Sequence, residues 1–113
     1  MLQSLDDTTL VAGQILPEDL PAIAALGVTM VVNNRPDGEE PGQPVNAEIE
    51  AAARAAGLDY RFIPVAGGFP AEQVAAMAAA VAEAEGKLLA FCRSGARSAH
   101  LWALATGKEI SRA

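Results

Sequence analysis

Four apolar segments of the chain are predicted to form the strands of a buried sheet. The clearest is 28–32, a continuous run of apolar residues that is typical of a parallel strand covered on both faces. The segment 58–65 alternates in part between apolar and polar residues, and the segment 1–9 is polar and is expected to be a loose start. The predicted strands are 10–15, 28–32, 58–65 and 87–91.

Helical patterns separate these segments and carry recognisable boundary residues. Pro17, followed by two acidic residues, is typical of a helix start. Gly27 and Gly57 lie where a left-handed residue commonly ends a helix, and Asn46 is expected to cap the second helix. The predicted helices are 17–26, 47–56, 71–85 and 98–106.

The alternation of strands and helices predicts an α/β fold. We expect one domain, 1–113, with a mostly parallel central sheet flanked by helices. A length of 113 residues also fits a single domain. Residues 107–113 read as the start of a further element, which leaves open whether the domain is C-terminally truncated or naturally short.

Composition and charge exclude several classes of function. Apolar residues make up 51% of the chain, so a sizeable core is expected. The net charge of −6 argues against general nucleic-acid binding, which depends on phosphate neutralisation. One cysteine and one histidine provide neither a disulfide nor a zinc site, so we expect no metal and no cofactor. No apolar run approaches the ~20 residues of a membrane span, and a cytoplasmic protein is expected.

The stretch 87–102 contains the residues with the most distinctive chemistry. Its apolar strand ends at the single cysteine, Cys92, and a short loop then leads into a helix. Such a junction directs backbone N–H groups and a helix dipole at one point, so it binds anions and lowers the pKa of a thiol. Cys92 is expected to attack or carry a group, Arg97 to bind oxyanion oxygens through two parallel N–H bonds, and Ser98 to donate to the thiolate.

The remaining loop residues are expected to complete the anion-binding loop. They are Arg93, Ser94, Gly95 and Ala96. Arg93 either flanks the pocket or is a solvated surface residue. Taken alone, a single cysteine is more often a small buried hydrophobe, but two arginines beside an apolar strand are costly unless they meet an anion.

Four motifs together resemble the phosphatase-like domain of beta-lactamase-hydrolase-like proteins, over residues 4–106. They are 11–14 (VAGQ), 33–39 (NNRPDGE), 63–65 (IPV) and 91–98 (FCRSGARS). The resemblance implies a dual-specificity or tyrosine-phosphatase-like fold with the cysteine loop at the base of a pocket. Members of this family are described as phosphatase-like and as sulfur transferases. Some are fused to a domain linked to persulfide oxidation, which implies a persulfide-oxidising partner.

Two features favour sulfur transfer over phosphate ester hydrolysis. Four residues separate Cys92 from Arg97, which is the spacing of rhodanese sulfurtransferases, whereas the resembling phosphatases have five. Those phosphatases carry an acidic residue in the loop that here is 66–70, which has none. Asp37 and Glu39 in the other long loop are the nearest candidates for a general acid, and an ordinary turn role is the alternative for Asp37.

We therefore expect a sulfurtransferase that forms a persulfide on Cys92 from thiosulfate or a persulfide donor. An external thiol would accept the sulfur, because the chain has no second cysteine. The alternative is a hydrolase of phosphate monoesters that forms a phosphocysteine at Cys92. A third hypothesis is a non-catalytic module that docks an anionic partner.

Four further residues have structural interpretations. Arg35 is expected to anchor its own loop by pairing with Asp37 or Glu39, rather than to line the pocket. His100 is expected to face away from the thiolate, and Leu101 and Trp102 to lie in the core.

Overall fold

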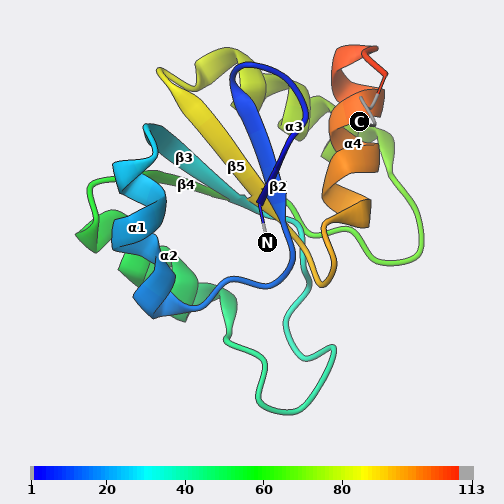
Figure 1. Cartoon of the computed structure of the whole chain (residues 1–113). Coiled ribbons are helices and arrows are strands. Elements are labelled where there is room, and N and C mark those ends of the chain that lie inside the picture. The colour runs from blue at the N-terminus through cyan, green and yellow to red at the C-terminus, as the bar shows by residue number, and fades with distance from the viewer. Residues whose placement is uncertain (1, 110–113) are drawn as a thin grey trace.

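The computed structural model describes residues 2–109 as a five-stranded sheet with helices on both faces (Figure 1). Helices α1 and α2 cover one face, and α3 and α4 cover the other. The strands are β1 (Leu2–Ser4), β2 (Thr9–Ala12), β3 (Val28–Asn33), β4 (Asp59–Phe62) and β5 (Lys87–Phe91). The helices are α1 (Leu20–Ala25), α2 (Asn46–Ala55), α3 (Ala71–Glu83) and α4 (Ala96–Thr106), and a 3-10 turn, Pro17–Asp19, precedes α1.

The strand order is β1-β2-β5-β3-β4, and every pairing except β1 with β2 is parallel. This confirms the predicted α/β class with a mostly parallel sheet. Strand β5 lies in the middle, between β2 and β3. The loop that contains Cys92 therefore leaves the centre of the sheet at its carboxyl end, where open α/β sheets bind ligands.

The core has two halves, one on each face of the sheet. Successive residues of a strand point to opposite faces, so alternate side chains pack into opposite halves. On β3, Met30 and Val32 pack towards α3 and α4, whereas Val31 packs towards α1 and α2. Trp102 and Leu101 are buried in the α3–α4 half, as predicted. Among the described residues, no helix is long and apolar enough to cross a membrane.

Several predicted boundaries are wrong: β2 and β4 each end three residues before the predicted strands 10–15 and 58–65 end, and the helix predicted over 17–26 begins as a 3-10 turn. Three further differences have a local physical reason. Strand β1 falls within the supposed loose start, because its three side chains are exposed and give no apolar signal. Helix α4 begins at Ala96 rather than at 98, since Gly95 already turns the chain. Asn46 is the first residue of α2 rather than its cap, and its N–H donates to Asp37 Oδ1 at 2.7 Å.

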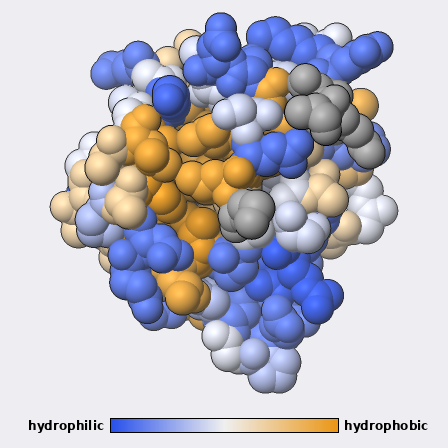
Figure 2. All heavy atoms as spheres, viewed as in Figure 1, coloured by the Kyte–Doolittle hydropathy of each residue, from blue (hydrophilic) through white to orange (hydrophobic). Residues whose placement is uncertain are grey.

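Apolar side chains gather on one face of the molecule, between α1 and the strands β1 and β2 (Figure 2). Leu2 and Leu26 are among the exposed residues that line a groove there. Ala12 and Gly13 form part of its wall, so the groove lies next to the segment on which the cysteine loop rests.

Candidate active site

The cysteine loop is a tight turn between β5 and α4. Cys92 is fully buried, and its Sγ accepts a hydrogen bond from the Gly95 N–H at 3.1 Å. Gly95 has φ +96°, a backbone conformation that residues other than glycine rarely adopt. A Cβ there would lie 3.3 Å from the Ala12 carbonyl oxygen. Glycine is therefore required at this position for the N–H to meet the sulfur.

The environment of Cys92 lowers the pKa of its thiol below the ordinary value. Burial alone raises this pKa, because it disfavours the charged thiolate. The backbone N–H groups of Ser98 and Ser94, then the Ser98 hydroxyl and the Gly95 N–H, lower this pKa, and the net result is a pKa below the ordinary value. The loop therefore stabilises a negative charge on the sulfur, as a nucleophilic thiol requires.

The backbone N–H of Ser98 lowers the pKa of the Cys92 thiol more than its hydroxyl does. A hydroxyl has one proton to donate, and that of Ser98 donates to Asn34 Oδ1 at 2.7 Å. The amide of Asn34 is fixed in turn, because its Nδ2 donates to the Ile63 carbonyl at 2.9 Å. The predicted hydroxyl–thiolate bond therefore requires the hydroxyl to turn away from Asn34.

Arg97 lies beside the cysteine and is held by a carboxylate from another loop. Its Nη1 donates to Glu39 Oε2 at 2.7 Å and to the Val65 carbonyl at 2.8 Å, and its Nη2 donates to Glu39 Oε1 at 2.9 Å. Glu39 raises the pKa of Arg97 most, and the nearby Cys92 thiolate raises it further. The guanidinium is therefore fixed in place with the sulfur within its reach.

Arg35 anchors the loop that carries Glu39. This arginine is 2% exposed, and it donates from Nε to Glu39 at 2.9 Å and from Nη2 to Glu40 at 2.8 Å. Its Nη1 donates to Gln14 at 3.0 Å. The predicted anchoring role is confirmed, and Glu39 with Glu40 are its partners. Hydrogen bonds from Arg97 and then from Arg35 lower the pKa of Glu39 to about 2, although burial opposes them.

Asp37, the candidate general acid, is directed to a different place. It is exposed, and its carboxylate accepts the Asn46 N–H at the start of α2. Within residues 2–109, no hydrogen bond joins it to the cysteine loop.

Arg93 is also exposed, and its Nε lies 4.0 Å from Glu40, at the rim of the site. His100 packs against the ring of Phe69, with 4.4 Å between ring centroids.

Asn34 is the site residue that sequence reasoning missed. It is fully buried, its N–H donates to the Phe91 carbonyl, and its own carbonyl accepts the Val65 N–H. It therefore ties the ends of β3 and β5 to the segment after β4, and its side chain reaches α4 through Ser98. A polar pair directly after a buried strand was the signal that could have identified it.

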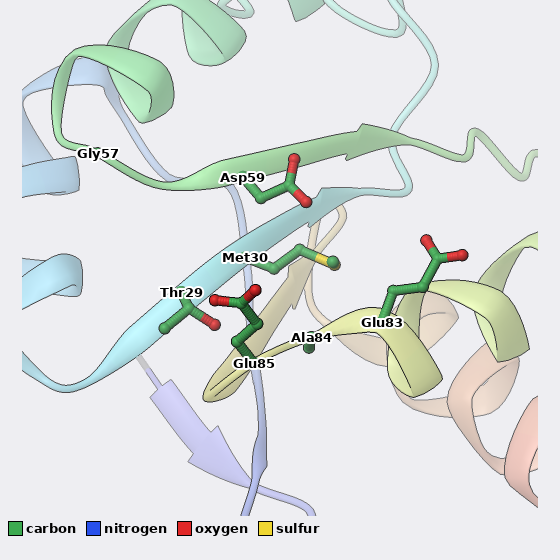
Figure 3. A pocket seen from close by; sticks show the side chains of 7 residues that line it. All are labelled: Thr29, Met30, Gly57, Asp59, Glu83, Ala84 and Glu85. Carbon is green, nitrogen blue, oxygen red and sulfur yellow. The ribbon is translucent and has the colours of Figure 1, made fainter.

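A second hollow lies at the opposite end of the sheet (Figure 3). Asp59 and Glu83 line it, and both carboxylates pair with Arg61, at 2.6 and 2.9 Å. Ligands of open parallel sheets bind at the carboxyl ends of the strands, whereas this hollow adjoins the start of β4. Within residues 2–109, no group of three or more His, Cys, Asp or Glu side chains is placed to hold a metal ion.

A buried thiol of lowered pKa that accepts a backbone N–H bond, with an adjacent arginine at the carboxyl end of a parallel sheet, forms a site suited to a cysteine nucleophile. Residues 2–108 match the family described as "Beta-lactamase hydrolase-like protein, phosphatase-like domain". The chain belongs to this family, as the sequence motifs indicated.

Curated relatives of the chain carry the same family description. The chain is 44% identical over 101 residues to the beta-lactamase hydrolase-like protein of Agrobacterium fabrum, and 41% identical to that of Xylella fastidiosa. Each alignment covers 88% of this chain and 23% of the relative. The chain thus spans about a quarter of the length of the curated relatives it matches.

Solved structures give the same class. A protein of Neisseria meningitidis described as a putative phosphatase superposes with a TM-score of 0.80 at 33% identity, over 88% of this chain and 71% of that one. A putative phosphatase of Shewanella putrefaciens also superposes with a TM-score of 0.80, at 26% identity, over 97% and 71% of the two chains. The active form of Tk-PTP, at 19% identity and a TM-score of 0.68, shares the fold. These comparisons support the phosphatase alternative better than the expected sulfurtransferase.

Proposed function

We propose that this domain hydrolyses phosphate monoesters through a phosphocysteine on Cys92. The observation that carries the proposal is the buried thiol of lowered pKa that sits under converging N–H groups beside Arg97. Structures that resemble the chain across most of its length are described as putative phosphatases, which supports the same reaction.

In the first step, the Cys92 thiolate attacks phosphorus and the bond from phosphorus to the leaving oxygen breaks. The electron pair of that bond leaves with the oxygen. Water then attacks the phosphocysteine, the S–P bond breaks, and the thiolate is regenerated as inorganic phosphate and a proton are released. The loop N–H groups that favour negative charge on the sulfur also suit the equatorial oxygens of the phosphoryl group.

Arg97 retains a free edge for those oxygens. A guanidinium has five N–H bonds, and three of them donate to Glu39 and the Val65 carbonyl. The two that take no part in these bonds belong to Nε and Nη2, and they lie on one edge as a parallel pair. Such a pair matches two oxygens of a phosphoryl group. Glu39 therefore orients the arginine without occupying its binding edge.

The proposal is tested by phosphate release from p-nitrophenyl phosphate by the wild type, Cys92→Ser and Arg97→Lys. We expect Cys92→Ser to lower kcat by at least about 10³-fold, since it removes the nucleophile. Arg97→Lys keeps the charge but loses the paired N–H bonds, and we expect a loss of about 10²-fold. Equal activity of the wild type and Cys92→Ser would refute the proposal.

Sulfur transfer is the second candidate, because of the four-residue spacing between Cys92 and Arg97. In this reaction the thiolate takes the outer sulfur of thiosulfate, the S–S bond breaks, and sulfite leaves with the electron pair. The Cys92 persulfide then passes its outer sulfur to an external thiol. The persulfide formed on that thiol would be the substrate of a persulfide-oxidising partner. Formation of thiocyanate from thiosulfate and cyanide, without phosphate release in the first assay, would favour this candidate.

A further inference from the structure

The acidic side chains near the cysteine loop are all engaged in other contacts. Glu39 has two arginine partners, Arg97 and Arg35, at 2.7 to 2.9 Å. With a pKa of about 2 it is ionised at neutral pH and has no proton to donate. Glu40 pairs with Arg35 at 2.8 Å, and Asp37 accepts the N–H at the start of α2.

The loop after Val65 also lacks a proton donor. It continues from the carbonyl that accepts a hydrogen bond from Arg97, so it borders the site, and its sequence is Ala-Gly-Gly-Phe-Pro over 66–70. Phe69 packs on His100. That histidine lies two residues beyond Ser98 on α4, about 200° around the helix from the side chain that faces Asn34. Arg97, three residues earlier and close to the same face of α4, reaches the sulfur, whereas the imidazole packs on Phe69. Within residues 2–109 no hydrogen bond joins the imidazole to the cysteine loop.

We propose, on the basis of the phosphatase function above, that the substrates are phosphoryl compounds whose leaving group departs without a proton, with acyl phosphates as the favoured class. In the first step, the Cys92 thiolate forms the S–P bond, the bond from phosphorus to the acyl oxygen breaks, and a carboxylate leaves with the electron pair. No proton has to be supplied. Water then releases phosphate as in the general reaction.

The pKa of the leaving group decides which substrates react. Carboxylic acids have a pKa of about 4, whereas a tyrosine phenol has a pKa of about 10. General acid catalysis is worth about 10²- to 10⁴-fold for a leaving group that must be protonated. A site without a donor forgoes this factor for phenyl and alkyl esters and loses nothing for an acyl phosphate.

The test compares kcat/KM at pH 7 for acetyl phosphate, p-nitrophenyl phosphate, phenyl phosphate and glycerol phosphate. The Cys92→Ser rate is subtracted for each substrate. We expect acetyl phosphate to exceed phenyl phosphate by at least about 10²-fold, with glycerol phosphate slower still. The adduct trapped by rapid acid quench should have the mass of a phosphoryl group on Cys92. An acetyl adduct would show attack at carbon and would overturn the proposal.

His100→Gln is the matched variant for the remaining donor. We expect it to leave the ratio of acetyl to phenyl phosphate rates unchanged. A selective loss on phenyl phosphate would identify His100 as an acid and overturn the inference. If phenyl phosphate is hydrolysed within about tenfold of acetyl phosphate in a Cys92-dependent way, the phosphatase function stands and this inference fails. If Cys92→Ser equals the wild type on p-nitrophenyl phosphate, both fail.

Discussion

At the residue scale, the thiol of Cys92 combines burial with stabilisation of its charge. Burial by itself raises the pKa of the thiol, and hydrogen bonds from loop N–H groups and from Ser98 bring it below the ordinary value. A thiol pKa below the ordinary value means that thiolate persists at lower pH than in an unfolded chain. The folded domain should therefore show its thiolate chemistry over a wider pH range.

Alkylation of Cys92 by iodoacetamide measures this directly. We expect the midpoint of the rate against pH to lie below that of the same chain unfolded in urea, where the thiol should titrate near about 8.5. Mass spectrometry reports one product, because the chain has one cysteine. Burial slows the folded reaction at every pH, so the midpoint and not the absolute rate is the readout. Coincident midpoints in the two states would contradict the activated thiol.

At the element scale, the junction of β5 and α4 depends on Gly95. Its φ of +96° combines with a close approach to the Ala12 carbonyl, so alanine there meets both backbone strain and crowding. We expect Gly95→Ala to lower the free energy of unfolding by about 1–3 kcal/mol. It should also lower the Cys92-dependent rate, because the N–H that meets the sulfur must shift.

Two matched glycines separate these effects. Gly57 shares the left-handed backbone, with φ +82°, but a Cβ there would meet no atom within 4 Å. Gly67 has open space and no positive φ. Urea denaturation should rank the loss of stability as Gly95→Ala above Gly57→Ala, and Gly67→Ala within about 0.5 kcal/mol of the wild type. A Gly95→Ala variant as stable as Gly67→Ala would show that the turn does not require glycine.

Helices and strands that carry a clear sequence pattern could be predicted. Segments with a continuous apolar pattern or a marked boundary, such as 28–32 and the helix ended by Gly57, lie where the pattern placed them. Strand β1 was not predicted, because an exposed edge strand buries no face and so carries no periodic hydrophobic signal. The order β1-β2-β5-β3-β4 depends on contacts between distant segments, which local pattern does not contain.

At the scale of the whole molecule, the candidate site joins segments far apart in the sequence. The position of Cys92 and its loop could be predicted from one strand–loop–helix pattern. The partner of Arg97 could not, because Glu39 lies 58 residues away and is brought there by parallel pairing of β3 with β5. For the same reason the role of Asn34, which reaches Ser98 across 64 residues, became visible only in the fold.

The pairing of Glu39 with Arg97 and Arg35 should appear in the pH dependence of global stability. The folded pKa of Glu39, about 2, is lower than its ordinary value of 4.5, so its stabilisation is complete above about pH 4.5. It is lost as the pH falls towards 2, because the unfolded chain binds that proton first. After allowance for solvent screening at a side chain that is 25% exposed, we expect about 1–2 kcal/mol to disappear over this range.

Urea unfolding of the wild type and Glu39→Gln at pH 6, 4 and 2.5 isolates this contribution. Other carboxylates with lowered pKa, such as Asp6 and Asp59, contribute equally to both proteins. The difference in unfolding free energy should therefore shrink as the pH falls. A Glu39→Gln difference that is the same at all three pH values would show that the ion pairs on Glu39 do not stabilise the fold.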